Sequence, residues 1–155
     1  MHVSPERFRA DWETAFGSME APELPPLPRR ATSGSAGYDF YAPSAFDLDP
    51  GKTISIPTGV RARISEGWVL MLFPRSGLGF KYRLQLNNTV GIVDADYFNA
   101  RNEGHIFIKL TNAGDRSIHV DAGEAFAQGV FLPFGLTEDD DAQGERTGGF
   151  GSTDR

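Results

Sequence analysis

The sequence predicts an all-β domain, a jelly-roll-like sandwich or small barrel, with a short N-terminal helix and a flexible C-terminal arm. Two observations favour this fold. Apolar residues alternate with polar ones in several short runs between residues 36 and 133, as they do in half-buried strands. Glycine and proline interrupt these runs at short intervals, as turns between strands do. The chain of 155 residues is long enough for one such domain with its own core.

Residues 1–30 are predicted to form a short helix and a proline-rich linker. Pro5 suits the first position of a helix, and aromatic residues at every fourth position from Phe8 to Phe16 keep one face apolar. The segment 21–28 is rich in proline and should be extended.

Four runs in the middle of the chain carry the clearest strand patterns. Ile54 and Ile56 alternate with polar neighbours, and the same alternation recurs in 60–64 and in 106–110. Residues 68–73 form a continuous apolar run, which is typical of a strand buried on both faces. No helix is expected to interrupt these strands.

The β domain is expected to span residues 31–137, and residues 138–155 are expected to form a mobile arm. The run 138–141 consists of acidic residues that cannot bury themselves, and the residues after it are rich in glycine and polar types.

Composition excludes several classes of function. The chain has no cysteine, so disulfides and thiolate metal sites are ruled out, and its three histidines lack the spacing of a zinc site. A net charge of -6 argues against direct nucleic-acid binding. No apolar run approaches the roughly 18 residues of a membrane span, and no export signal is evident. We therefore expect a cytoplasmic location, in the host cytoplasm if a phage encodes the chain.

The segment 91–97 places Asp94, Asp96 and Tyr97 at a turn after a strand-like run. A carboxylate can act as a general base that activates water. Aspartate is equally common in turns for backbone reasons, so this segment alone leaves both interpretations open.

The segment 74–79 offers a turn with a guanidinium, a hydroxyl and backbone N–H groups, a combination that can bind an anion. An ordinary loop is the alternative. Asp39 is a lone acid among apolar residues, and buried acids are usually paired, so we expect Arg75 to be its partner. Gln128 is a weaker candidate, because a polar residue in a strand more often faces solvent or bonds to backbone.

Five segments in order resemble the five motifs of the homotrimeric deoxyuridine triphosphatase (dUTPase) family, of bacterial or phage type. The matching segments are 36–42, 74–79, 88–97, 123–128 and 146–153. The resemblance implies a jelly-roll trimer that hydrolyses dUTP to dUMP and pyrophosphate, which limits uracil incorporation into DNA. In the family, each active site draws on three chains.

The resemblance also implies a role for each matching residue. Asp94 corresponds to the residue that activates the attacking water, and Asp39 to a supporting acid. Asn88 and the backbone around Gly91 correspond to uracil-binding groups, and Tyr97 to the ring that packs on the deoxyribose. The phosphate-binding positions correspond to Arg75, Ser76, Gly77 and Gln128.

In the arm, Arg146 corresponds to a γ-phosphate contact, Phe150 to a ring that covers uracil, and Ser152 to a further phosphate contact. The arm would close over the active site as a lid. Family members bind Mg²⁺ through the substrate phosphates and water, in keeping with the waters that this ion retains.

The chain departs from the family pattern in three places. In the tail, Arg146 precedes Phe150 by four positions, where five is the commoner spacing. Residues 98–103 intervene where typical members pass almost directly from Asp-Tyr to Gly-Glu, and a helix with a proline-rich linker replaces the extended N-terminal strand. Two alternatives to the hydrolase stay open. One is a dCTP deaminase-like enzyme on the same fold, and the other is a regulatory protein that binds a partner through the 98–103 loop or the N-terminal helix.

Overall fold

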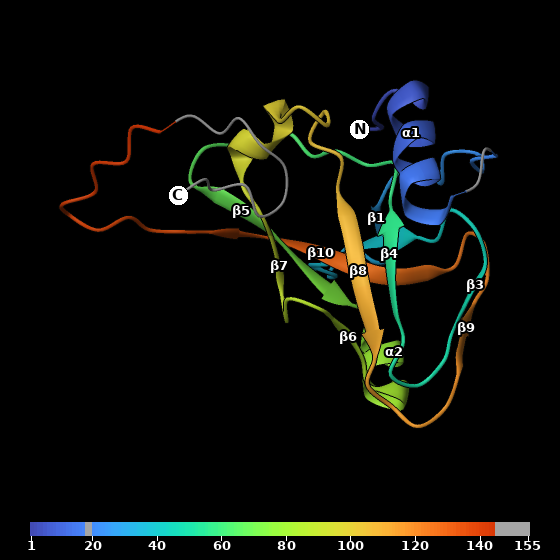
Figure 1. Ribbon diagram of the computed structural model, residues 1–155. Coiled ribbons are helices and arrows are strands. Elements are labelled where there is room, and N and C mark those ends of the chain that lie inside the picture. The colour runs from blue at the N-terminus through green and yellow to red at the C-terminus, as the bar shows by residue number, and fades with distance from the viewer. Residues whose placement is uncertain (18–19, 145–155) are drawn as a thin grey trace.

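A computed structural model describes residues 1–17 and 20–144 and consists of one N-terminal helix beside a sandwich of short strands (Figure 1). The prediction of an all-β fold with a short N-terminal helix is confirmed. None of the helices in the described ranges is long and apolar enough to cross a membrane.

Five antiparallel strands form the largest sheet, in the order β1-β2-β10-β5-β7. They are β1 (Arg29–Arg30), β2 (Tyr38–Tyr41), β10 (Ala125–Pro133), β5 (Trp68–Pro74) and β7 (Gly91–Val93). Because β10 pairs with both β2 and β5, the sheet brings together three of the segments that the sequence singled out.

Two smaller sheets complete the sandwich. One has the order β4-β8-β6, with β4 (Thr53–Pro57), β8 (Phe107–Asn112) and β6 (Leu84–Leu86). The other pairs β3 (Phe46–Leu48) with β9 (Ile118–Val120). The inward side chains of the three sheets share one core, whose most enclosed members include Leu72, Ile56, Ile108, Leu110 and Phe126.

The outer face of the largest sheet is apolar and is not covered by the described part of the chain. Residues paired across antiparallel strands point to the same face, so this surface contains Val69, Met71, Phe73, Ile92, Val130 and Leu132. Ile92 is 45% exposed, and the others range from half-buried to exposed. The prediction that residues 68–73 are buried on both faces is therefore met on the core face only.

Helix α1 (Pro5–Phe16) begins after Ser4, whose hydroxyl accepts a hydrogen bond from the Arg7 N–H at 3.1 Å. It ends at Gly17, which adopts a left-handed φ of 62°. Its apolar face packs Phe8 and Trp12 against the body of the protein, as the periodicity predicts.

Two sequence-based expectations about secondary structure are wrong. The alternation in 60–64 does not make a strand, because the backbone there pairs with the N-terminus instead: the Val3 N–H bonds to the Gly59 carbonyl, and the Arg61 N–H to the Met1 carbonyl. A short helix, α2 (Ser76–Tyr82), interrupts the strands. Its two glycines disfavour helix formation and it has no buried residue, so it lacks the apolar repeat that identifies a helix in a sequence.

Candidate active site

Asp39, Arg75 and Gln128 meet at one end of the largest sheet. Asp39 on β2 pairs in register with Gln128 on β10, and Arg75 directly follows β5. An Arg75 Nη1 lies 3.1 Å from an Asp39 carboxylate oxygen, which confirms the predicted ion pair. The Gln128 amide nitrogen donates to the Pro74 carbonyl at 3.3 Å. The Asp39 side chain is 13% exposed and that of Arg75 is 41% exposed, so the acid is sheltered and the guanidinium faces outward.

Arg75 also marks the edge of a cavity of about 530 Å³. Ser76 and Gly77, the first residues of α2, line it together with Lys81, Tyr82, His119 and Glu124. The hydrogen bond from His119 to the Asp47 carboxylate, and then the one to Asp121, raise the pKa of the imidazole. The two cationic side chains of this cavity, Arg75 and Lys81, could bind an anionic ligand.

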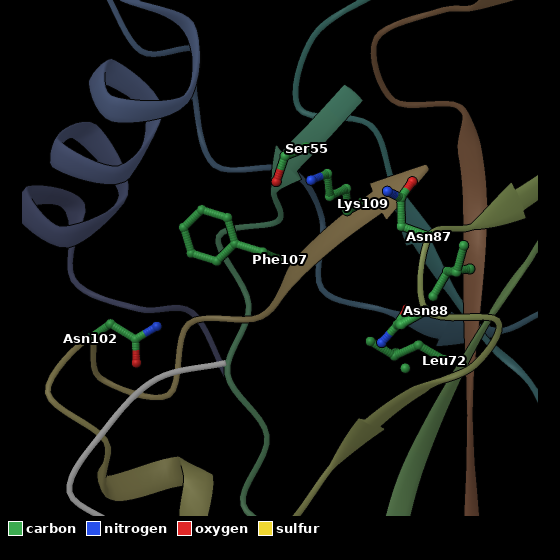
Figure 2. Close-up of a pocket in the computed structure, with 9 residues that line it drawn as sticks. Ser55, Leu72, Asn87, Asn88, Asn102, Phe107 and Lys109 are labelled. Carbon is green, nitrogen blue, oxygen red and sulfur yellow. The ribbon is translucent and has the colours of Figure 1, made fainter. Parts of the chain in front are cut away.

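A second cavity, of about 430 Å³, lies beside the hairpin that joins β6 to β7 (Figure 2). Asn88 and Gly91, the predicted uracil-binding positions, are among its lining residues. A Cβ at Gly91 would lie 3.0 Å from the Leu72 Cβ, so glycine allows β7 to approach β5 closely here. The other residues that line this cavity are Ser55, Leu72, Leu86, Asn87, Asn102, Phe107 and Lys109.

Asp94 and Asp96 are both exposed at the end of β7, where the 3-10 helix η1 (Ala95–Asn99) begins. Tyr97, by contrast, is 2% exposed. Its hydroxyl donates to the His105 carbonyl at 2.7 Å and accepts from the Asn102 amide at 2.8 Å. Tyr97 does not line either of these two cavities.

The two groups of candidate residues lie far apart within one chain. The register of β5 with β7 sets Leu70 opposite Val93, which places Asp94 beside Val69. Arg75 lies at the other end of β5, about 20 Å away at roughly 3.3 Å per residue. The two cavities also have no lining residue in common. A single chain therefore does not bring Asp94 to the cluster of Asp39, Arg75 and Gln128.

The remaining predicted residues, Arg146, Phe150 and Ser152, lie outside the described part of the chain. Within that part, no group of three or more His, Cys, Asp or Glu side chains could hold a metal ion.

Sequence reasoning missed several residues that line the cavities. Ser55 and Lys109 pair across β4 and β8, and both occupy outward polar positions of predicted strands. Two polar residues on the same face of adjacent strands could have been recognised from the sequence as candidate site residues. Asn102 gave no such signal, because it reaches the second cavity from the irregular 98–103 segment.

Comparison with known proteins identifies the family. A model of the dUTPase family matches residues 25–154. The deoxyuridine 5'-triphosphate nucleotidohydrolase of Lactococcus lactis is 44% identical over 130 residues, which cover 82% of this chain and 87% of that protein. The enzyme of the same name from Escherichia coli O9:H4 is 42% identical over 138 residues, which cover 84% and 88% of the two chains.

Solved structures give the same result. The dUTPase of Streptococcus mutans superimposes with a TM-score of 0.65 at 40% identity, over 77% of this chain and 97% of that one. A mutant dUTPase from phage phi11 of S. aureus, described for the coordination of a structural Mg(II) ion, shares the fold with a TM-score of 0.64 at 24% identity, over 80% of this chain and 94% of that chain. The chain belongs to the dUTPase family.

Proposed function

We propose that the protein hydrolyses dUTP to dUMP and pyrophosphate in an active site to which more than one copy of the chain contributes, with Asp94 as the general base. The activity itself follows from the family, whose members at 42% and 44% identity are deoxyuridine 5'-triphosphate nucleotidohydrolases. These relatives favour hydrolysis over the alternative of dCTP deamination. The separation of Asp94 from Arg75 along β5 is the observation that supports an active site shared between chains.

Asp94 is exposed at the end of β7, where its carboxylate can reach water. In the proposed step, Asp94 takes a proton from a water molecule whose oxygen bonds to the α-phosphorus. The bond from the α-phosphorus to the bridging oxygen breaks, and pyrophosphate leaves. Asp39 does not touch the water; it holds Arg75 in place.

The cavity beside the β6–β7 hairpin is the proposed deoxyuridine site. Asn88 and the backbone at Gly91 would bind the uracil edge, and rejection of cytosine would follow from polar groups that only uracil satisfies. Tyr97 is buried and does not line this cavity, so its proposed part in deoxyribose binding is indirect, through the hydrogen bond that its hydroxyl accepts from Asn102.

The cavity at Arg75 is the proposed triphosphate site. Arg75, Ser76 and Gly77 line it, and Gln128 lies behind them on β10. Mg²⁺, held by the phosphates and water, would neutralise charge on the triphosphate. Arg146 and Ser152 of the arm would add phosphate contacts, and Phe150 would cover the uracil.

A homotrimer would unite the two cavities. The apolar outer face of the largest sheet has the composition of an interface between subunits, and it ends at Asp39 and Gln128. Rotation about a symmetry axis would bring the Arg75 end of β5 in one copy toward Asp94 of another.

The activity can be tested by incubating the protein with dUTP, dCTP and UTP in the presence of Mg²⁺ and identifying the products. We expect dUMP and pyrophosphate from dUTP and no turnover of the other two nucleotides. Ammonia released from dCTP, or equal hydrolysis of UTP, would contradict the proposal. The hypothesis that a regulatory protein binds α1 or the 98–103 segment stays a prediction.

A further inference from the structure

We propose that Asn102 contacts the bound nucleoside as a hydrogen-bond acceptor, presented by the 98–103 segment. This inference rests on the proposed function, because it takes the cavity beside Asn88 and Gly91 as the deoxyuridine site. It gives the 98–103 segment, which departs from the family pattern, a part in substrate recognition.

Asn102 and Asn88 lie on opposite sides of the cavity, and Phe107 also lines it (Figure 2). The Asn102 Oδ1 is buried and has no hydrogen-bond partner among the described residues. Native proteins leave few buried polar atoms without a partner, and each one that remains calls for an explanation, such as a role in a functional site or a bound water. A ligand N–H or O–H group that reaches this oxygen would satisfy it.

The orientation of the amide follows from its other contacts. The Asn102 Nδ2 donates to the Tyr97 hydroxyl at 2.8 Å and to the His105 carbonyl at 3.3 Å. A carbonyl oxygen can only accept, so the nitrogen must lie on this side of the amide. The group left for a ligand is therefore the oxygen, an acceptor.

His105 anchors this arrangement from the core. Its Nε2 accepts the Gly59 N–H at 2.8 Å, so the proton of the neutral ring is on Nδ1, which donates to Asp11 at 2.6 Å. Burial acts to raise the pKa of Asp11, but the hydrogen bonds from His105 and Arg7 outweigh it and hold that pKa below its usual value. Helix α1 thus fixes the residue whose carbonyl orients both Tyr97 and Asn102.

The two ends of the 98–103 segment are also held. Arg61 donates to the Phe98 carbonyl at 2.6 Å, and its guanidinium lies 3.7 Å from the centre of the Phe98 ring. Glu103 accepts hydrogen bonds from the N–H and the hydroxyl of Ser4, at 2.9 and 2.7 Å. Asn102 is therefore positioned before any ligand binds, which lowers the entropy lost on binding.

Deoxyuridine offers two donors to such an acceptor, the imide N3–H of the base and the 3′-hydroxyl of the sugar. The test measures dissociation constants by calorimetry for three α,β-imido triphosphates: those of deoxyuridine, 2′,3′-dideoxyuridine and N3-methyldeoxyuridine. Each is measured on the wild-type protein and on Asn102→Ala. Asn99→Ala is the matched control, because Asn99 is exposed at the end of η1 and lines neither cavity.

Asn102→Ala should weaken binding of the deoxyuridine analogue by about 2- to 13-fold, the range of one neutral hydrogen bond. The analogue that lacks the relevant donor should bind the wild type and Asn102→Ala equally well. Equal weakening for all three ligands, or no weakening for any, would overturn the proposal. Asn99→Ala should leave all three constants unchanged.

The stoichiometry of binding guards against a folding defect. A defect would lower the fraction of Asn102→Ala chains that bind, whereas loss of a hydrogen bond changes the dissociation constant; a fall in stoichiometry with an unchanged dissociation constant would overturn the proposal. If the wild-type protein does not bind the deoxyuridine analogue at all, the proposed function fails. If it binds the analogue and Asn102→Ala is neutral, only the role of Asn102 fails.

Discussion

Replacing Arg75 by alanine should separate catalysis from stability. The Asp39–Arg75 pair is partly exposed on the arginine side, and pairs of this kind contribute at most about 1 kcal/mol to folding. We therefore expect Arg75→Ala to shift the free energy of unfolding by about 1 kcal/mol or less.

The effect on turnover should be much larger, for two reasons. One charge-assisted hydrogen bond to phosphate, about 1.5–3 kcal/mol, is lost. The Asp39 carboxylate then faces the phosphates without its partner. At a separation of about 6 Å and an effective dielectric constant of about 20–40, that repulsion is about 1.4–2.8 kcal/mol. The sum, about 3–6 kcal/mol, corresponds to a fall in kcat/KM of about 10²- to 10⁴-fold.

The assay is steady-state release of pyrophosphate from dUTP, with urea unfolding measured on the same samples. Arg75→Lys keeps the charge but loses the planar fork, so its loss should be intermediate. A kcat/KM within threefold of wild type for Arg75→Ala, or a loss of stability as large as the loss of transition-state binding, would contradict this role of Arg75.

Three further predictions follow from the same structure. Asp94→Asn should abolish hydrolysis and keep dUTP binding largely intact, so full turnover in that variant would exclude Asp94 as the base. Deletion of residues 142–155 should cripple turnover and leave a folded oligomer by light scattering; normal turnover would rule out a lid. Because the folded-state pKa of Asp11 is lowered, its stabilising contribution is complete above its ordinary value near pH 4 and is lost as the pH falls through the folded value. Melting temperatures between about pH 2.5 and 5 should therefore fall less steeply for Asp11→Asn than for the wild type, and parallel curves would contradict that assignment.

The strands that alternate cleanly were predictable because burial of one face dictates their period. Ile54 and Ile56 show this for β4. The 60–64 run alternates in the same way but is not a strand, because its backbone pairs with the N-terminus at an isolated bridge, and no local pattern predicts that distant contact. The helix α2 was not predicted, because it buries no residue and therefore shows no apolar repeat in the sequence.

Some contacts of the candidate site could likewise be predicted from the sequence, and others could not. The Asp39–Arg75 pair could be predicted, since a lone acid in an apolar strand needs a cation. The contacts of His105 with Asp11 and of Glu103 with Ser4 could not, because they join residues 94 and 99 positions apart. No local pattern encodes such contacts, and they place Asn102 beside the cavity.

A subunit-mixing experiment tests the shared active site most directly. Asp94→Asn chains and Arg75→Ala chains, each nearly inactive alone, are unfolded together in equal amounts and refolded. If Asp94 and Arg75 of one site come from different chains, random assortment leaves about one quarter of the sites with both residues intact, and about one quarter of wild-type turnover should return. If the mixture is no more active than its two components, each site lies within one chain, and the account of a shared site is wrong.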